Sequence, residues 1–162
     1  MVKDVQSGDA KEQIQKWLME DGWSLRQESG KEAVWAFVGE DRLGRKVVVG
    51  QNIGREDEVI LQGTVRFDEA TTDRIAQLRE DERNDFLWDL RFELLRTDLE
   101  FAGVEAPLKE IRVTERIFFD ALTKDTFLQR VAEVRKGVLA VIWMVNRRFA
   151  QPPPPKQLGF QK

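Results

Sequence analysis

Carboxylates, lysines and hydroxyls are the side chains of this sequence that could carry out acid–base or nucleophilic chemistry. The 162 residues contain no histidine, no cysteine and no tyrosine. The chain therefore lacks the side chain that most often transfers protons near neutral pH, the thiolate nucleophile and the usual nitrogen and sulfur ligands of zinc. Its serines, at positions 7, 24 and 29, have no imidazole to activate them. This composition favours a non-catalytic protein-binding domain over an enzyme.

Two groups of residues resemble chemical motifs only in part. Gly39, Gly44, Gly50 and Gly54 fall at predicted turns or strand ends, and their spacing matches neither a dinucleotide-binding pattern nor a P-loop. We interpret the acidic run 80–85 as a solvated helix face rather than a metal site. We therefore expect no metal and no cofactor. An enzyme that depends on a pair of carboxylates stays open as an alternative.

Charge and hydropathy limit the partners of the chain. The formal net charge is −3, the sequence pI is about 5.2, and Lys and Arg are interleaved with Asp and Glu, whereas nucleic-acid-binding proteins need a basic surface. The longest apolar run, residues 138–145, is far shorter than the roughly 20 residues that span a bilayer. Residues 1–13 lack the apolar region of a signal peptide. We expect a cytoplasmic protein that binds neither nucleic acid nor membrane.

The spacing of apolar residues predicts an α+β fold. A helix is expected over 10–21, with Asp9 as its N-cap and Gly22 as its C-cap. The pattern then changes to alternation, which is typical of strands joined by short turns. The predicted result is an antiparallel meander of three or four strands, over 23–27, 33–39, 46–51 and 58–67.

The second half of the chain returns to helical spacing. Residues 71–97 are expected to form one long helix with a kink, or two helices broken near Glu80. Two strands follow, at 98–104 and 111–119, and a long C-terminal helix is predicted over 125–149. The predicted order is therefore helix, meander, helix, two strands, helix.

We expect a single α+β domain over residues 9–150, flanked by disordered ends. Residues 1–8 precede the first helical pattern. Residues 151–162 contain four consecutive prolines, each of which lacks a backbone N–H and fixes φ. The prediction for this segment is a disordered, proline-rich tail without helix or strand.

The predicted middle helix carries more apolar surface than one buried side requires. A helix that is apolar on two sides must be covered on both. Either the domain itself buries both sides, or one of them contacts another protein. The first stripe consists of Phe86, Leu87, Leu90 and Leu94. The second consists of Trp88, Phe92, Leu95 and Leu99.

The last helix shows a similar excess of apolar residues. Val141, Trp143 and Met144 lie outside its expected core stripe. We expect the packing of the domain to cover most of this surface. The core stripe itself is predicted to comprise Phe127, Val131, Val134, Val138, Leu139, Ile142 and Val145.

The predicted function is the binding of another protein, or of a second copy of the chain in a homodimer. The candidate interface residues are Trp88, Phe92 and Leu95, with Arg91 and Arg96 at the rim. Aromatic and arginine side chains contribute most of the binding energy at protein interfaces, and Leu95 belongs to the same apolar stripe as Trp88 and Phe92.

A small-molecule-binding or sensor domain is the alternative function. It would use a pocket between the sheet and the last helix, lined by Trp35, Phe37 and Trp143. A closed apolar cavity at this place would favour this alternative.

Three segments of the sequence carry a family resemblance: 88–95 (WDLRFELL), 122–125 (LTKD) and 141–149 with its VIWM and RRF motifs. They are similar to a small prokaryotic family of unknown function that has the type III secretion chaperone-like fold. The resemblance covers about residues 9–149. It implies the element order of secretion chaperones, which are acidic homodimers that bind extended segments of other proteins without nucleotide. The predicted strand 23–27 and the proline-rich tail depart from that pattern.

Overall fold

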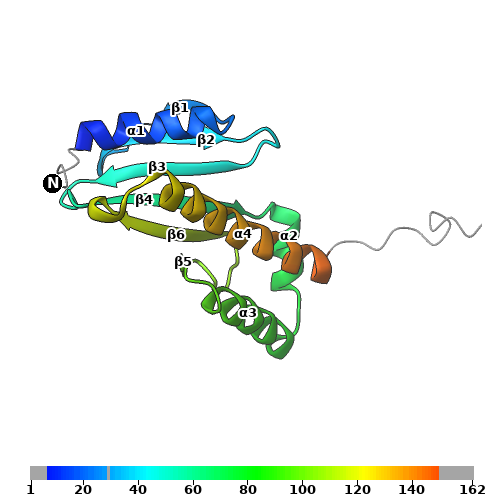
Figure 1. Ribbon diagram of the computed structural model, residues 1–162. Helices are drawn as coiled ribbons and strands as arrows, with labels where there is room; N and C mark the ends of the chain where they lie inside the picture. The colour runs from blue at the N-terminus through cyan, green and yellow to red at the C-terminus, as the bar shows by residue number, and fades with distance from the viewer. Residues whose placement is uncertain (1–6, 29, 150–162) are drawn as a thin grey trace, which may run out of the picture.

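The computed structural model describes residues 7–28 and 30–149 (Figure 1). The predicted disorder of residues 1–6 and the predicted proline-rich tail lie outside these described residues. The described helices and strands contribute side chains to one hydrophobic core.

Helix α1 (Ser7–Glu20) begins earlier than the sequence pattern predicts. Ser7 and Gly8 belong to its first turn, so the prediction that they are disordered is wrong. Asp9 is the third helical residue and not the N-cap. Its carboxylate still favours the helix, because it lies near the positive end of the helix dipole. At the other end, Gly22 has a φ of 87°, the left-handed conformation expected of its predicted role as C-cap.

The predicted meander is confirmed and belongs to a six-stranded antiparallel sheet in the described part of the chain. Its strands are β1 (Ser24–Glu28), β2 (Ala33–Glu40), β3 (Lys46–Asn52) and β4 (Glu58–Arg66).

The two later strands extend the sheet beyond β4. They are β5 (Glu100–Ala102) and β6 (Glu110–Phe118), and the strand order is β1-β2-β3-β4-β6-β5. β6 pairs with β4 along its whole length. β5 is shorter than predicted, because only its three residues follow the register of β6 before the chain turns away.

The middle of the chain forms two helices that are separated just before Glu80, so of the two predicted alternatives the one with a break near Glu80 is confirmed. Helix α2 (Glu69–Ala76) begins after Asp68, whose carboxylate accepts a hydrogen bond from the N–H of Thr71 at 2.7 Å. This is an ordinary N-cap bond, which satisfies a backbone donor that the helix itself cannot. Helix α3 (Glu80–Leu95) follows after a short connection.

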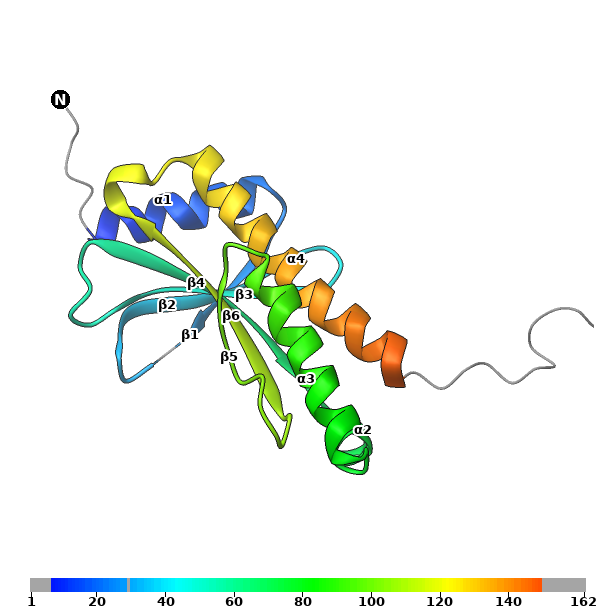
Figure 2. The same ribbon diagram turned by 90° about the horizontal axis from the view of Figure 1, so that it is seen from below.

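Helix α4 (Lys124–Phe149), predicted over nearly the same residues, follows the short 3₁₀ helix Phe119–Ala121 and runs across the sheet. Its first turn is capped by Thr123, whose hydroxyl oxygen accepts a hydrogen bond from the N–H of Thr126 at 3.1 Å. α1 and α4 cover one face of the sheet, and α3 packs beside α4 near the β5 edge (Figure 2). Among the described residues, no helix covers the opposite face, and none is long and apolar enough to cross a membrane.

The close approach of α4 to the sheet depends on a glycine in β4. A Cβ atom on Gly63 would lie 2.5 Å from Cγ2 of Val138 and 2.9 Å from Cγ1 of Val134. Leu61, two residues earlier on β4, also points toward the helices and is fully buried. The core therefore forms between the sheet and its covering helices.

The buried side of α4 differs from the predicted stripe near its end. Val141 is buried, although the spacing predicts it outside the stripe, and Ile142 is exposed, although the spacing predicts it inside. Val141 lies four residues from both Gly137 and Val145, which are buried, so these three share one side of the helix. Ile142 is turned by about 100° from that side and borders a surface hollow of about 200 Å³.

Candidate functional site

The two apolar stripes of α3 have different environments. Phe86, Leu87, Leu90 and Leu94 are buried in the core. The side chains of Trp88, Phe92 and Leu95 are 52%, 54% and 67% exposed. We call these three residues the α3 face. Leu99, the fourth residue of the predicted second stripe, follows the end of the helix and is buried.

The two aromatic rings of the α3 face pack on each other. The ring centroids of Trp88 and Phe92 lie 5.8 Å apart with an interplanar angle of 29°. The guanidinium of Arg91 lies over the Trp88 ring, 4.7 Å from its centroid, and its Nε–H donates to the carbonyl oxygen of Val104 at 3.0 Å. The cation–π contact and the hydrogen bond together link the indole to the loop between β5 and β6.

The structure brings the five predicted interface residues together at one end of α3. Arg91 flanks the α3 face, and Arg96 directly follows Leu95 at the C-terminal end of the helix. Arg96 is exposed and forms an ion pair of 3.4 Å with Glu93. The exposure of these side chains agrees with the hypothesis, and their role in binding stays a prediction.

The pocket predicted between the sheet and α4 is not formed by the residues named for it. Trp35 and Phe37 are buried and stack with their ring centroids 6.0 Å apart. The Nε1–H of Trp35 donates to Oε1 of Gln51 at 3.0 Å. Trp143 is 65% exposed on the outer side of α4. These aromatics therefore do not line a common cavity, because two face the core and one faces solvent.

A hollow that the sequence analysis missed lies on the uncovered face of the sheet. It has a volume of about 470 Å³, with Ala36, Val48 and Ile60 on its floor and Glu28 and Lys31 at its rim. The hollow is open, whereas small-molecule sites enclose most of the ligand surface. It also lies on the side of the sheet away from α4, so it does not restore the predicted pocket. In the sequence, this hollow is indicated only by two small residues, Ala36 and Gly50, which are paired on the neighbouring strands β2 and β3.

Glu115 is a buried carboxylate that lies near the half-exposed carboxylate of Glu133. Arg130 donates to Glu115 Oε1 at 3.4 Å and to Glu133 Oε2 at 3.3 Å. The other oxygen of Glu115 is buried and has no hydrogen-bond partner in the structure. Burial, together with the nearby Glu133 and Asp98, raises the pKa of Glu115 to about 7, although Arg130 acts in the opposite direction. No group of acidic residues in the described chain has the arrangement of a metal site.

The raised pKa of Glu115 predicts that stability depends on pH. In the folded chain this carboxyl keeps its proton up to about pH 7, whereas the ordinary value is 4.5. The folded state therefore binds one more proton than the unfolded state between these values. The contribution of this group to the free energy of unfolding is complete below pH 4.5 and is lost as the pH rises through 7. Because Arg130 and nearby solvent screen the buried charge, we expect a loss of about 1–2 kcal/mol.

The substitution Glu115→Gln tests this prediction, because an amide of similar shape cannot titrate. Urea unfolding of both proteins at pH 5 and at pH 8 measures the free energies. Wild type should lose more stability than the variant between the two pH values. Equal losses in the two proteins would contradict the assignment of this titration to Glu115.

Comparisons with known proteins give two matches. The sequence model of a family described as "Uncharacterized conserved protein (DUF2299)" matches residues 10–145. A solved structure, described as the crystal structure of an uncharacterized protein from Methanothermobacter thermautotrophicus, is 28% identical to this chain with a TM-score of 0.81. The alignment covers 87% of this chain and 99% of the other. No curated protein matches the chain. Neither description states an activity, a ligand or a partner.

Proposed function

The chain belongs to the family of uncharacterized conserved proteins called DUF2299, and we propose that it is a non-catalytic protein-binding domain whose contact surface is the α3 face. The family assignment carries no activity, so the proposal is argued from the surface of the molecule. Its single strongest support is the exposure of Trp88, Phe92 and Leu95 next to each other on one helix.

Two stacked aromatics and a leucine on one exposed helix face are unusual for a surface without a partner. Contiguous apolar patches on soluble proteins often mark interaction sites. Trp, Phe and Arg are enriched in the centres of such sites, where a partner can exclude water from them. The α3 face and its neighbour Arg91, which lies over the Trp88 ring, together supply these residue types.

The amino-acid composition supports the non-catalytic part of the proposal. The chain has no histidine or cysteine. Its perturbed carboxyl, Glu115, lines neither the hollow on the uncovered face of the sheet nor the hollow beside Ile142. Because Glu115 is buried and Arg130 bridges it to Glu133, we interpret this pair as structural.

A chaperone-like or adaptor-like role is the finer form of the proposal. It draws on the resemblance of the sequence to the secretion chaperone-like family, whose better-known relatives bind segments of other proteins. The acidic net charge of −3 is compatible with such a role. In this role the α3 face would contact a partner chain by hydrophobic burial, and Arg91 and Arg96 would influence partner choice from the rim.

The double substitution Trp88→Ala and Phe92→Ala should weaken association strongly while the chain stays folded. Both side chains are about half exposed, so their loss removes little from the core. A central interface aromatic contributes about 2 kcal/mol, so association should weaken by roughly 30-fold or more. Light scattering measures self-association. Photo-crosslinking in host cells, from a probe at the α3 face, measures contact with other proteins.

The matched control removes two exposed apolar side chains at another place. Leu43→Ala with Ile53→Ala does this, since both residues are exposed in the turns that flank β3. The control should leave assembly mass and crosslinking unchanged. An unfolded Trp88→Ala, Phe92→Ala protein would mean that these aromatics belong to the core. Unchanged mass and unchanged crosslinking would show that the α3 face binds nothing.

A further inference from the structure

We infer that the α3 face is the docking site of the chain's own proline-rich tail, residues 151–162, which a protein partner must displace before it binds. This inference rests on the proposed function and adds a means of regulating the same surface. It follows from where the described chain ends, from the reach of the tail and from the residues that the tail contains.

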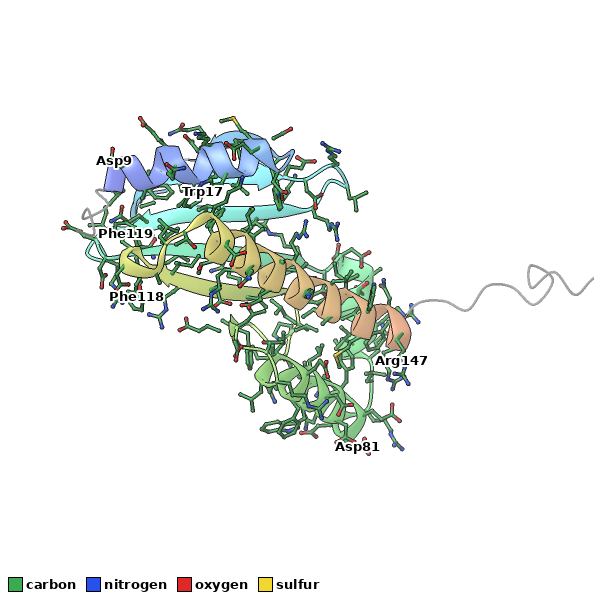
Figure 3. All side chains as sticks on the ribbon, in the orientation of Figure 1. Asp9, Trp17, Asp81, Phe118, Phe119 and Arg147 are labelled. Atoms are coloured by element: carbon green, nitrogen blue, oxygen red, sulfur yellow. The ribbon has the colours of Figure 1, made fainter. Side chains whose placement is uncertain are left out.

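The described chain ends beside the first half of α3. Phe149, the last residue of α4, is buried, and its ring meets that of Phe86 edge-on, with centroids 4.9 Å apart and an interplanar angle of 87°. Arg74 of α2 donates to the carbonyl oxygen of Phe149. Figure 3 labels Arg147 near the end of α4 and Asp81 in the first turn of α3 at the same end of the molecule. The tail therefore begins just beyond a point that is held next to α3.

The tail is long enough to reach the α3 face from this point. The face lies on the opposite side of α3 from the buried Phe86, and a helix with its side chains is about 10–12 Å wide. Trp88 and Leu95 are about 10 Å apart along the helix axis. A polyproline II chain advances about 3.1 Å per residue, so residues 151–162 span about 37 Å. This reach exceeds the path around and along the helix.

Proline is a residue type that exposed aromatic pairs bind. Residues 152–155 are four consecutive prolines. Such segments dock on aromatic-lined surfaces, and their preformed conformation keeps the entropy cost low. Trp88 and Phe92 stack on each other and are each about half exposed. Four prolines extend over about 12 Å, which is close to the length of the α3 face, so we place them along both rings.

The charged side chains around the α3 face are acidic on balance. Asp85, Asp89 and Glu93 border the face, together with Arg91 and Arg96. Glu93 pairs with Arg96 at 3.4 Å. Asp85 and Asp89 are exposed and form no ion pair with any residue that the structure describes. Of these five side chains, two carboxylates and one guanidinium therefore remain outside that pair.

The tail carries the opposite charge. Lys156 and Lys162 are its charged side chains. Lys156 directly follows the prolines, so their docking on Trp88 and Phe92 brings its ammonium group toward the acidic border of the face. Because the tail is covalently attached, its effective concentration at the face is in the millimolar range, and a weak contact is enough to keep the face covered.

A single spin label tests whether the tail contacts the α3 face. The chain has no cysteine, so Gln161→Cys in the full chain gives one attachment site for a nitroxide. In nuclear magnetic resonance spectra, docking should broaden the indole N–H signal of Trp88 and the amide signal of Phe92. Trp17 on α1, which Figure 3 labels far from α3, should keep a sharp indole signal.

Variants of the tail give the matched comparison. Replacing residues 152–155 with four serines keeps the length and the lysines, and it should reduce the broadening at Trp88 about fivefold or more, because serine lacks the ring and the preformed conformation of proline. Gln151→Ser with Gln157→Ser changes two polar residues beside the prolines and should leave the broadening unchanged. Isotope-labelled chain without nitroxide, mixed with unlabelled chain that carries it, should show no broadening, because each tail docks on its own chain.

Three results would overturn the inference. They are a sharp Trp88 signal in the spin-labelled full chain, equal broadening in the full chain and the four-serine variant, and broadening in the mixture as strong as within one chain. The last result would mean that the tail docks on a second copy. The measurement needs no partner, so each of these results leaves the proposed function in place.

The effect on a partner separates the inference from the proposed function. A tail that covers the face for about nine-tenths of the time weakens partner binding about tenfold. The four-serine variant should therefore give up to about tenfold more photo-crosslinking from the α3 face in host cells. If the spin label shows docking and the four-serine variant still crosslinks to no other protein, the proposed function fails while the docking of the tail stands.

Discussion

Replacing Leu90 with alanine is expected to lower the free energy of unfolding by about 3 kcal/mol. Leu90 is fully buried on the inner side of α3. The substitution removes three buried carbon atoms and leaves a cavity that the surrounding side chains fill only in part. Urea unfolding at neutral pH, followed by circular dichroism, measures the loss.

Leu95→Ala is the matched control, because it makes the same chemical change in the same helix. Leu95 is exposed, and surface substitutions usually change stability by less than about 0.5 kcal/mol. The variant should therefore unfold like wild type but associate more weakly. Equal destabilisation by the two substitutions would mean that both sides of α3 are core, and that the α3 face is not a surface at all.

Replacing Gly103 with alanine should destabilise the fold about as much as Leu90→Ala does. The free energy of unfolding should fall by about 3 kcal/mol or more. Gly103 follows β5 with a φ of 92°, a conformation that side chains with a Cβ rarely adopt. The added Cβ would also overlap the carbonyl oxygen of Glu110, the first residue of β6. Because that oxygen belongs to the backbone, the clash cannot be relieved by rotating a side chain.

Gly54→Ala separates the cost of the left-handed backbone conformation from the cost of the steric clash. Gly54 has a φ of 85°, but a Cβ there would have no neighbour within 4 Å. The Gly54→Ala variant should lose about 1 kcal/mol of unfolding free energy, which is the cost of the backbone conformation alone. Thermal unfolding of the two variants side by side gives the difference. Equal destabilisation by Gly103→Ala and Gly54→Ala would mean that the loop between β5 and β6 shifts to relieve the clash with Glu110. Such a loop would not hold α3 firmly.

Much of this fold could be predicted because its signals are local. Alternating apolar residues and short polar turns indicate the meander, and these patterns depend only on neighbours in sequence. Helix caps are equally local, and the glycine at position 22 ends α1 as expected. Asp9 was misassigned because an acidic residue is as favourable inside the first turn as at the cap.

The remaining features depend on contacts between distant segments. The spacing of apolar residues at the end of α4 fits more than one buried side, and only the position of the sheet selects Val141 over Ile142. Glu115 lies on β6 and Glu133 on α4, so their pairing has no local signature. The division of α3 into a buried and an exposed side follows from its place near the sheet edge. The sequence indicated two apolar stripes and could not tell which one faced solvent.

The hydrogen bond from Arg91 to Val104 has a consequence for the thermodynamics of any association at the α3 face. Ordering a flexible side chain in a complex costs about 0.5–1.5 kcal/mol of rotamer entropy. Trp88 lies between Phe92 and an arginine that the loop already holds, so its χ angles are restricted before a partner arrives. Association would therefore lose little side-chain entropy at this residue. Arg91→Lys would keep the charge yet lose the fixed guanidinium plane, and the entropy of binding would become less favourable.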